Sequence, residues 1–501
     1  MLNNNIHAGA NGGSALEACR TPQQLEAALD MQRGLLCKKL SCACEQIRES
    51  QSVVQVSGQL VRLAGLTMEV EGCALRTGQR CMVQGRSGRV EAEVVGFDHS
   101  RLLLMPVEYG DGMASGDRVY PLERDTSVPV GEGLMGRVVN GLAAPLDAMG
   151  PLECRHYVQL HAPTINPLER GLVLEPLDVG VRSVNGLLTL GCGQRVGLLS
   201  PTGVGKSTLL GMMTRNTTAD VTILAMIGER GREIREFAEN ILGPEGMKKA
   251  IIVAAPADHS PVMRLRAALV AHRFAEFFRD RGGKVLLLMD SLTRYAQAQR
   301  EIALAVGEPP SARGYPPSAF SMMSRLVERV GNGREGRGSV SAVYTVLVEG
   351  EDSEDPVAES ARAILDGHIV LSREQAVSGL YPAVDLAASV SRTMPSCVSA
   401  EQLLRANRFL YLSEKDRTGR ELALLGAYQK GNDPAIDLGM RCGDSLRAYL
   451  SQGVDECVSL AQSWQQLEAM LNGQDTQAGH APEPPTETNQ PAETAVASAT
   501  G

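Results

Sequence analysis

The sequence has few aromatic residues and no excess of positive charge. Aromatic residues make up 4% of the 501-residue chain, with a single tryptophan, and the formal net charge is −9 at pH 7. Proteins whose main task is nucleic-acid binding generally carry a basic surface, and those that bind RNA add aromatic side chains that stack on bases. The composition therefore argues against a primary nucleic-acid binder.

Paired cysteine motifs are also missing. The chain has eleven cysteines, from Cys19 to Cys457, but no Cys-x-x-Cys pair. Cys42 and Cys44 lie near Cys37 in the sequence, and no histidines gather beside them. This arrangement indicates reduced thiols rather than a disulfide framework or a metal site, so we expect a reducing compartment.

Long hydrophobic runs are absent as well. No apolar run approaches the ~20 residues that a membrane-spanning helix needs. The N-terminal stretch MLNNNIHAGANGGSALEACR has neither a basic segment nor an apolar one, so we expect no secretion signal. We expect a cytoplasmic protein, with peripheral membrane association as the remaining option.

Residues 1–50 begin as a polar segment and continue as an amphipathic helix. The stretch 21–40 places Thr21 at the N-cap, Pro22 in the first turn and Gln24 where it completes a capping box. Leu25, Leu29 and Leu36 share one face of this helix. The face could pack on the rest of the chain or dock a partner, and the sequence leaves both open.

Residues 51–125 change to a period of two. Short alternating runs such as GLTMEVEG and RVEAEVVGF are separated by frequent glycines. This pattern predicts a small antiparallel β-barrel. The residues expected to face its interior include Leu66, Met68, Val70, Val90, Ala92 and Val94.

Residues 126–390 alternate apolar strand candidates with helical stretches. The candidates read RVGLLS, VTILAMI, AIIVAA, KVLLLMD, SAVYTVLV and HIVLS. Runs this continuous are typical of strands buried on both faces, so they predict an α/β domain in which helices cover a parallel sheet.

Helical spacing replaces the strand pattern beyond residue 390. The stretches AEQLLRANRFLYL, RELALLGAYQ and GDSLRAYLSQGVDECVSLAQSWQQLEAML predict a helical C-terminal domain over 391–472. Residues 473–501 lack aromatics and are rich in Pro, Thr, Glu and Ala, which predicts a disordered tail.

The strand candidate RVGLLS leads directly into PTGVGKST and then into a helix, the context of a phosphate-binding loop. Gly203 and Gly205 allow backbone amides to converge on phosphate oxygens beside the helix N-terminus. Lys206 would reach the terminal phosphates, and the Ser207 hydroxyl would hold Mg²⁺. Ser200 stands where the usual pattern begins with glycine, which weakens the bare match. The predicted nucleotide-binding segment comprises Ser200, Pro201, Thr202, Gly203, Val204, Gly205, Lys206, Ser207 and Thr208.

Two further strand candidates end at or near a carboxylate. Asp290 ends KVLLLMD, which places it at the carboxyl edge of the sheet, where it could order Mg²⁺ through water. Glu229 follows VTILAMI and could polarise a water that attacks a γ-phosphate. Asp290 could equally cap a buried strand, and Arg230 and Arg232 could equally neutralise Glu229 in a salt bridge.

Four segments resemble a known family. GERGREI, MDSLTRYAQAQREIALAVGEPPSARGYPPS, AILDGHIVLSR and YPAVDLAASVSR are similar to the catalytic subunits of the rotary ATPases, and within them to the flagellum-specific ATPases of the flagellar type III protein-export apparatus. The resemblance covers about residues 53–471. It implies a RecA-like P-loop core between a small β-barrel and a helical C-terminal domain, and the family tolerates a non-glycine residue where Ser200 stands.

The resemblance also implies roles for single residues. Glu229 matches the carboxylate that activates water, Arg230 a γ-phosphate contact, and Asp290 the aspartate of the Mg²⁺ site. Tyr381 matches the aromatic residue that stacks on adenine, and Arg392 an arginine finger that reaches into a neighbouring subunit's site. From sequence alone, Tyr381 could instead be a core aromatic and Arg392 a surface cation. The catalytic set implied is Glu229, Lys206, Arg230 and Arg392.

The implied function is Mg²⁺-dependent ATP hydrolysis by a homohexameric ring that energises export of flagellar proteins. One chain carries both the catalytic set and a finger that acts in trans, so a ring of identical chains is the economical assembly. The implied partners are a regulator or stator protein at the N-terminal helix, export-gate and stalk proteins, and export substrates with their chaperones, at the inner face of the cytoplasmic membrane.

Several other functions remain open. An injectisome-type secretion ATPase is the nearest alternative, followed by the catalytic subunit of an ATP synthase. A hexameric RNA helicase would use a related motor core, but the few aromatics and the net charge of −9 count against it. A non-catalytic nucleotide-binding subunit would lack the carboxylate that Glu229 supplies.

Overall fold

The computed structural model describes residues 33–34, 36–41, 57–86, 88–110, 112–122, 127–334, 337–348 and 355–475. These residues belong to two units, 1–56 and 57–501, which we treat separately. In the first unit, residues 33–34 and 36–41 are helical, and Leu36 and Leu40 are exposed. The predicted capping residues of this helix lie outside the described residues, as do Cys42 and Cys44.

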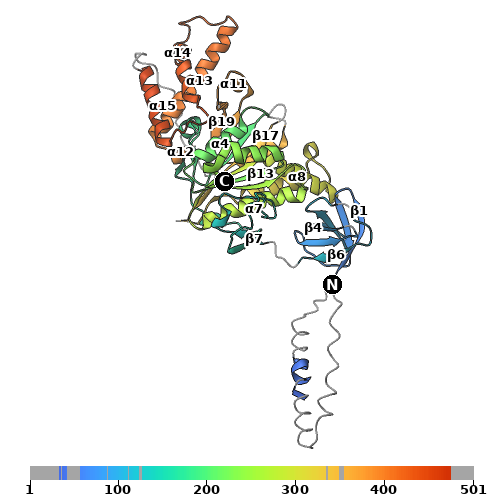
Figure 1. Ribbon diagram of the computed structural model, residues 1–501. Coiled ribbons are helices and arrows are strands. Elements are labelled where there is room, and N and C mark those ends of the chain that lie inside the picture. The colour runs from blue at the N-terminus through green and yellow to red at the C-terminus, as the bar shows by residue number, and fades with distance from the viewer. Residues whose placement is uncertain are drawn as a thin grey trace, which may run out of the picture. The chain divides into compact units, whose positions relative to one another are not determined.

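The second unit begins with a closed barrel in the strand order β1-β2-β5-β4-β3-β6, drawn in blue in Figure 1. Each neighbouring pair is antiparallel, so the barrel predicted from the period of two is confirmed. Met68, Val70, Ala92 and Val94 are fully buried in it. Its strands are β1 (Gly58–Ala64), β2 (Thr67–Glu71), β3 (Arg80–Gln84), β4 (Arg89–Asp98), β5 (Arg101–Pro106) and β6 (Arg118–Pro121).

Leu66 does not lie in a strand that faces the barrel interior, as the alternation suggested. It lies in the turn between β1 and β2, where Gly65 has a φ of +58°. Its side chain packs against the core of the central domain instead. Two polar contacts join the same parts of the chain: the Arg266 guanidinium lies 2.9 Å from Glu93, and the Ser260 hydroxyl donates to the Val107 carbonyl at 2.6 Å.

The central domain contains a nine-stranded sheet in the order β19-β18-β12-β17-β15-β13-β14-β8, with β16 paired to β17. The pairings from β18 to β8 are parallel, whereas β19 and β16 run antiparallel to their neighbours. All six strand candidates appear within two residues of their predicted bounds. The strands are β8 (Val138–Val139), β12 (Arg195–Ser200), β13 (Val221–Ile227), β14 (Ala250–Ala255), β15 (Lys284–Asp290), β16 (Gly331–Asn332), β17 (Ser339–Leu347), β18 (Gly367–Leu371) and β19 (Val384–Ser391).

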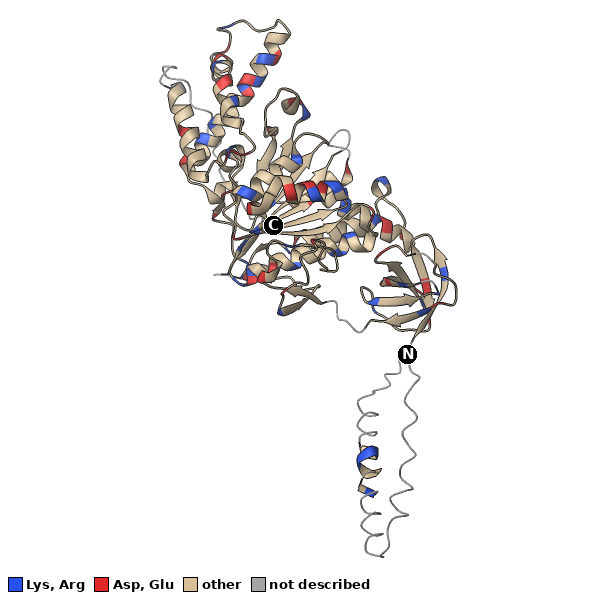
Figure 2. Ribbon diagram, viewed as in Figure 1, with Lys and Arg blue, Asp and Glu red and all other residues tan. Residues whose placement is uncertain are grey.

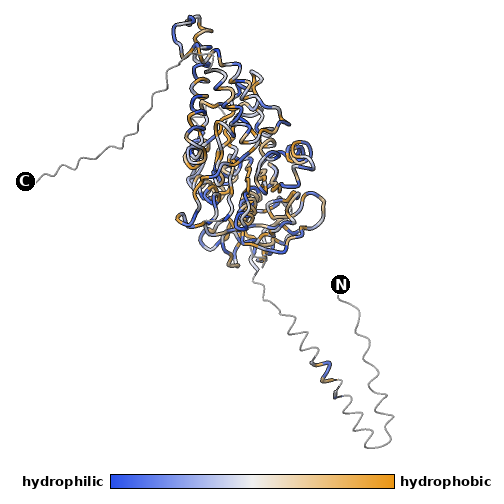
Figure 3. Tube along the Cα trace, turned by 90° about the vertical axis from the view of Figure 1, so that its left-hand side faces the viewer, coloured by the Kyte–Doolittle hydropathy of each residue, from blue (hydrophilic) through white to orange (hydrophobic). Residues whose placement is uncertain are grey.

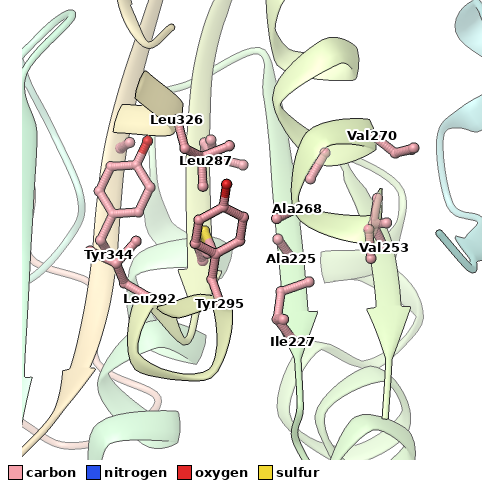
Figure 4. Close-up of a cluster of buried hydrophobic side chains, with 14 of the residues drawn as sticks. Ala225, Ile227, Val253, Ala268, Val270, Leu287, Leu292, Tyr295, Leu326 and Tyr344 are labelled. Carbon is pink, nitrogen blue, oxygen red and sulfur yellow. The ribbon is translucent and has the colours of Figure 1, made fainter. Parts of the chain in front are cut away.

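Helices cover both faces of this sheet, as predicted for strands without a polar side. Figure 4 shows one face, where Ala268 and Val270 of α7 lie over Ala225 and Val253 of the sheet. The alternate strand residues, such as Leu224, form the second core with α4 and the C-terminal helices. The helices of the first face are α7 (Pro261–Asp280), α8 (Leu292–Ala305), α9 (Pro317–Val327) and α10 (Pro356–Ile364), and those of the second include α3 (Arg182–Leu187), α4 (Lys206–Asn216) and α5 (Gly231–Glu236).

The remaining short elements connect these layers. A π-helix, η3 (Phe237–Leu242), and α6 (Gly243–Met247) follow α5, and α11 (Arg373–Val377) lies between β18 and β19. Strand β7 (Ser127–Val130) pairs with β9 (His156–Gln159), and β10 (Pro176–Leu177) with β11 (Leu190–Gly191). The described residues also contain three turns of 3-10 helix: η1 (Glu132–Leu134), η2 (Pro167–Glu169) and η4 (Ala312–Gly314).

The C-terminal part is helical, as predicted, but its helices are divided differently. After the short α12 (Met394–Cys397), helix α13 (Ala400–Leu424) runs through two of the predicted stretches and ends before GAYQ. The third stretch is interrupted: α14 (Pro434–Leu450) and α15 (Leu460–Asp475) are separated by a loop over 451–459. A Cβ at Gly439 of α14 would lie 2.7 Å from the Asp416 amide nitrogen, so glycine allows α13 and α14 to approach closely. The predicted tail lies, from residue 476 on, outside the described residues.

The surface carries charge of both signs. Figure 2 shows Lys and Arg alternating with Asp and Glu along α13, where Arg417 pairs with Glu414 at 2.7 Å. Hydrophobic and hydrophilic stretches interleave along the trace in Figure 3. Within the described ranges, no helix is both long and apolar enough to cross a membrane.

Candidate active site

The predicted phosphate loop connects β12 to α4. Gly203 and Gly205 have φ values of 80° and 93°, and Gly205 is the N-cap of α4, so the loop requires glycine at these two positions. Ser200, by contrast, is the last residue of β12, fully buried, with its hydroxyl donating to the Pro201 carbonyl at 2.8 Å. Its backbone is extended, a conformation that any residue adopts, so glycine is not required at this position. Val204 is buried in the core below the loop.

Three charged side chains meet at the carboxyl edge of the sheet. The Lys206 ammonium lies 2.6 Å from Oδ1 of Asp290 and 3.5 Å from Oε1 of Glu229. They converge because β12, β13 and β15 all run parallel in one sheet, so the residues after each strand emerge at the same edge. The structure thus brings together three residues that the sequence predicted separately. Glu229 has Lys206 as its partner, and not the neighbouring arginines considered as its salt-bridge alternative.

Thr345 is a member of this cluster that the sequence did not reveal. It lies on β17, the strand between β12 and β15, and its hydroxyl donates to Asp290 Oδ1 at 2.6 Å. Together with Lys206 it fixes the orientation of the Asp290 carboxylate. A threonine inside an apolar strand carries no motif, and only the strand order identifies its partner.

The acidity of Glu229 is strongly altered in this environment. Burial raises the pKa of the Glu229 carboxyl to about 7, the Asp290 carboxylate adds to this effect, and the Lys206 ammonium opposes it. Glu233, on the first turn of α5, also raises the Glu229 pKa through a hydrogen bond. A carboxyl group with a pKa near neutral pH can take up and release a proton under working conditions, as a general base must.

The site suits a magnesium ion bound mainly by substrate oxygens. Ser207 is exposed in the first turn of α4, and both hydrogen bonds of the Asp290 side chain fall on Oδ1. The described residues contain no group of three or more His, Cys, Asp or Glu that could hold a metal without a substrate. One hydroxyl and one carboxylate beside a phosphate loop are the oxygen donors that fit Mg²⁺, which keeps several waters and binds phosphate oxygens.

Arg230 lies beside this cluster but outside it. Its side chain is 80% exposed, and its guanidinium is 3.9 Å from Glu233. It is the N-cap residue of α5, directly after Glu229. The structure therefore leaves the Arg230 side chain free to move towards a phosphate without breaking a close ion pair.

Tyr381 forms one wall of an apolar pocket next to the phosphate loop. The pocket has a volume of about 250 Å³, and the Tyr381 ring lies 3.7 Å from the position a Cβ would take on Gly205. Tyr381 is 45% exposed, which rules out the alternative of a buried core aromatic. The other lining residues are Val204, Thr208, Leu209, Met212, Leu371, Pro382, Ala383, Gln452 and Val454. Gln452 and Val454 belong to the C-terminal part and were not predicted.

Arg392 lies at the opposite end of the sheet from the phosphate loop. It follows β19, whose last residue, Ser391, is paired with Gly367 at the start of β18. Its guanidinium donates to the carbonyls of Arg362 and Leu365, at 3.3 Å each. Because β18 runs parallel to β12 and a strand rises ~3.3 Å per residue, the Arg392 backbone is more than about 10 Å from the loop of its own chain. The arrangement does not bring Arg392 to the Lys206 cluster of the same subunit.

Two family models match the chain. Residues 180–391 match the nucleotide-binding domain of the ATP synthase alpha/beta family, and residues 398–469 match the C-terminal domain of the T3SS EscN ATPase. The first model contains every residue of the Lys206 cluster, and the second covers helices α13 to α15 almost completely.

Curated relatives match over most of their length. The flagellum-specific ATP synthase of Pseudomonas aeruginosa is 53% identical over 83% of this chain and 94% of its own, and that of Salmonella typhimurium is 49% identical over 83% and 93%. A type 3 secretion system ATPase of Xanthomonas euvesicatoria is 45% identical over 80% and 90%.

Solved structures confirm the fold class. The assembled ATPase EscN from the type III secretion system of enteropathogenic E. coli superposes with a TM-score of 0.78 at 35% identity, over 83% of this chain and all of that one. EscN in complex with its central stalk EscO gives a TM-score of 0.75 at the same identity and coverage. The sequence identity, the coverage and the shared three-part fold together place this chain in the family of the flagellum-specific ATP synthases.

Proposed function

We propose that this chain is the ATPase that energises protein export through a flagellar type III secretion apparatus. The observation that carries the proposal is the meeting of Lys206, Glu229 and Asp290 at the mouth of a glycine loop. The membership in a family of flagellum-specific ATP synthases supports the choice of ATP and of export.

ATP would occupy both the loop and the apolar pocket beside it. The backbone amides between Gly203 and Lys206 lie at the N-terminus of α4, where the first amides of a helix have no partner within it. They can therefore bind the phosphate chain. The adenine then fits the pocket between Val204 and Tyr381, where the tyrosine offers its ring and the loop its aliphatic surface. Lys206 would exchange its two carboxylate partners for phosphate oxygens, which removes it from Glu229.

Ser207 and Asp290 would hold Mg²⁺, directly and through water. The ion supplies positive charge that neutralises the phosphate oxygens during transfer. Thr345 keeps Asp290 in place, since its hydroxyl bonds to Oδ1, and no hydrogen bond to Oδ2 is found among the described residues. The donor set therefore serves magnesium only when a nucleotide brings the phosphate oxygens.

Glu229 would act as the general base for the attacking water. Its carboxyl pKa of about 7 makes the group a proton acceptor near neutral pH. Asp290 is assigned the metal instead, because Thr345 holds its Oδ1 beside the loop at 2.6 Å. Arg230, exposed beside Glu229, can turn towards the γ-phosphate.

Arg392 would complete the site of a neighbouring subunit. Its distance from the loop of its own chain, and its exposed position at the end of β19, support a role in trans. The relative EscN has been solved as an assembled ATPase, which supports an assembly of identical chains here. In a homohexameric ring, every Lys206 cluster would receive an Arg392 from the next subunit. Such a finger stabilises the charge that develops during phosphoryl transfer.

The proposed partners follow from the export role. The complex of EscN with its stalk EscO supports a stalk protein as one partner of this ring. We further propose a regulator at the N-terminal helix, export-gate proteins, export substrates and chaperones, and a location at the inner face of the cytoplasmic membrane. The domain boundaries proposed for this machine are 51–125, 126–390 and 391–472.

Two experiments test the proposal. Purified protein should hydrolyse ATP only with Mg²⁺, and Lys206→Ala should abolish the activity and the binding of ATP. In a strain that lacks the gene, the intact chain should restore flagellin secretion and motility, whereas Lys206→Ala should not. Hydrolysis that persists in the Lys206 variant would overturn the site, and full motility without the gene would overturn the role.

An injectisome ATPase is the second candidate. The identity of 45% to the Xanthomonas secretion ATPase, against 53% to the Pseudomonas flagellar one, favours the flagellar role. Loss of effector secretion with motility intact would reverse this preference.

A further inference from the structure

The loop over residues 451–459 joins α14 to α15 and also forms part of the pocket wall. Val454 is 47% exposed and lines the pocket together with Gln452. Helix α14 ends at Leu450 and α15 begins at Leu460, so the loop connects directly to both C-terminal helices. Anything that moves the pocket side of this loop therefore acts on the ends of two helices.

Gln452 holds the loop to two other parts of the chain, the segment with Gly180 and Arg182 and the segment with Tyr381. Its buried side chain accepts from the Arg182 amide at 2.7 Å and donates to the Gly180 and Glu456 carbonyls, at 2.8 Å each. Its own backbone amide donates to the carbonyl of Tyr381 at 2.9 Å. Gln452 thus links three parts of the structure: the segment with Gly180 and Arg182, the 451–459 loop, and Tyr381 in the pocket wall.

The side-chain bonds of Gln452 need an amide. One atom must accept from a backbone N–H while the other donates to two carbonyls, a combination that glutamine and asparagine alone provide. A glutamate would place an oxygen against the Gly180 carbonyl, and a leucine would leave the Arg182 amide and the Glu456 carbonyl without this partner. The residue type therefore follows from its bonding and not from packing alone.

A second tie joins the same loop to the phosphate-binding helix. Arg215, in the last turn of α4, donates to the Val454 carbonyl at 2.8 Å and also to the Ile241 carbonyl. Helix α4 begins with Lys206, so its two ends touch the phosphate cluster and the 451–459 loop.

We propose that Gln452 is a positioning residue that holds the 451–459 loop against the base pocket, so that nucleotide binding is transmitted to α14 and α15. The inference rests on the proposed function and adds the route by which the C-terminal helices sense the nucleotide. A base in the pocket contacts Val454 and Tyr381, both of which are tied to Gln452 or Arg215.

The test compares Gln452→Ala and Arg215→Met with Gln402→Ala as the control. Gln402 completes the capping box of α13 on the surface and does not line the pocket, so its variant reports the cost of losing a C-terminal hydrogen bond alone. Both loop variants should raise the KM for ATP about tenfold with kcat changed less than about twofold, because they loosen a binding wall and not the reacting groups.

Two readouts separate positioning from general damage. Magnesium tripolyphosphate carries no base, so its inhibition constant should stay within about twofold of wild type in both variants. In hydrogen exchange, ADP should protect the amides of residues 451–475 in wild type and in Gln402→Ala, but not in Gln452→Ala.

Each outcome decides the inference. An unchanged KM in both loop variants, an equal loss of tripolyphosphate affinity, or ADP protection of 451–475 that survives Gln452→Ala would overturn it. In those cases wild type remains active and dependent on Lys206, so the proposed function stands. Absence of ATP hydrolysis in wild type would overturn both.

Discussion

The two ends of the central sheet carry opposite arrangements of charge. At the carboxyl edge, the Lys206 ammonium lies within 3.5 Å of both Glu229 and Asp290, and the three side chains are at most 14% exposed. At the other end, Arg392 contacts only backbone carbonyls among the partners described. The first arrangement holds most of a site, whereas in the second the Arg392 side chain forms no ion pair with any residue that the structure describes.

Because of this difference, neither end of the sheet alone provides all the charged groups that we propose for phosphoryl transfer. At the carboxyl edge the one buried ammonium already faces two carboxylates, so a further cation beside Mg²⁺ and Arg230 would help to balance the charge of a triphosphate during transfer. Neutral backbone carbonyls hold the Arg392 guanidinium in place, so no ion pair among the described residues has to break before it can meet a phosphate. We infer that each subunit provides most of one site and the missing cation of the next.

Among variants that still bind ATP, the largest effect on turnover is expected at Arg392. Replacing it with alanine should lower kcat by ~10³–10⁵-fold, the range for arginine fingers. Affinity for ATP should be retained, because the phosphate loop and the pocket belong to the other end of the sheet. Single-turnover kinetics and nucleotide titration measure the two quantities separately. Wild-type turnover in Arg392→Ala would show that its position at the sheet end has no catalytic meaning.

The next largest effect is expected at Glu229. Glu229→Gln keeps the shape of the side chain but removes the base, so kcat should fall by ~10²–10⁴-fold with ATP still bound. Mixing purified variant with labelled ATP and following bound nucleotide over time checks both parts. Glu233→Gln is the matched control, since Glu233 contacts Glu229 but has no ion pair with Lys206 among the described residues. A fall of equal size in both variants would contradict the assignment of the base.

The pH profile sharpens the comparison at the carboxyl edge. The Glu229 base works only when deprotonated, and burial and Asp290 raise its pKa to about 7. In the free enzyme, kcat/KM should therefore rise with pH up to about 7 and fall roughly tenfold per unit below it. A steady-state profile measures this. A midpoint near the ordinary glutamate value of 4.5 would contradict the environment described here.

The smallest effect is expected at Thr345. Thr345→Val removes the hydroxyl that holds Asp290 Oδ1 but keeps the shape of a β-branched residue in β17. Loss of one hydrogen bond to a charged acceptor should lower turnover about tenfold and raise the Mg²⁺ concentration needed for half-maximal rate. Thr222→Val, in buried β13 without a contact to Asp290, is the control. An unchanged magnesium requirement would show that Lys206 alone orients Asp290.

Sequence reasoning found the residues that lie at the ends of strands. Lys206, Glu229 and Asp290 each follow an apolar run, and parallel strands bring such positions to one edge. Thr345 stayed hidden because its role depends on the strand order, in which β17 lies between β12 and β15. The order of the strands is a tertiary property that the local pattern does not contain.

The C-terminal helices show a second limit of the pattern. Helical spacing continued across residues 451–459, although the chain leaves the helix there. The loop exists because Gln452 finds partners about 270 residues away, at Gly180 and Arg182. Val454 reaches the pocket wall in the same way, through a hydrogen bond from Arg215, which is 239 residues away in the sequence. A hydrophobic period describes only neighbouring residues, so it cannot predict such contacts.

A mixing experiment tests the central claim most directly. Lys206→Ala lacks the nucleotide site but keeps Arg392, and Arg392→Ala lacks the finger but keeps the nucleotide site. Each variant should be inactive alone. Mixed and allowed to assemble, they should regain ATPase activity, because some interfaces then pair an intact Lys206 with an intact Arg392 from the next subunit. Activity of the mixture no greater than the sum of the two separate variants would contradict a site shared between subunits.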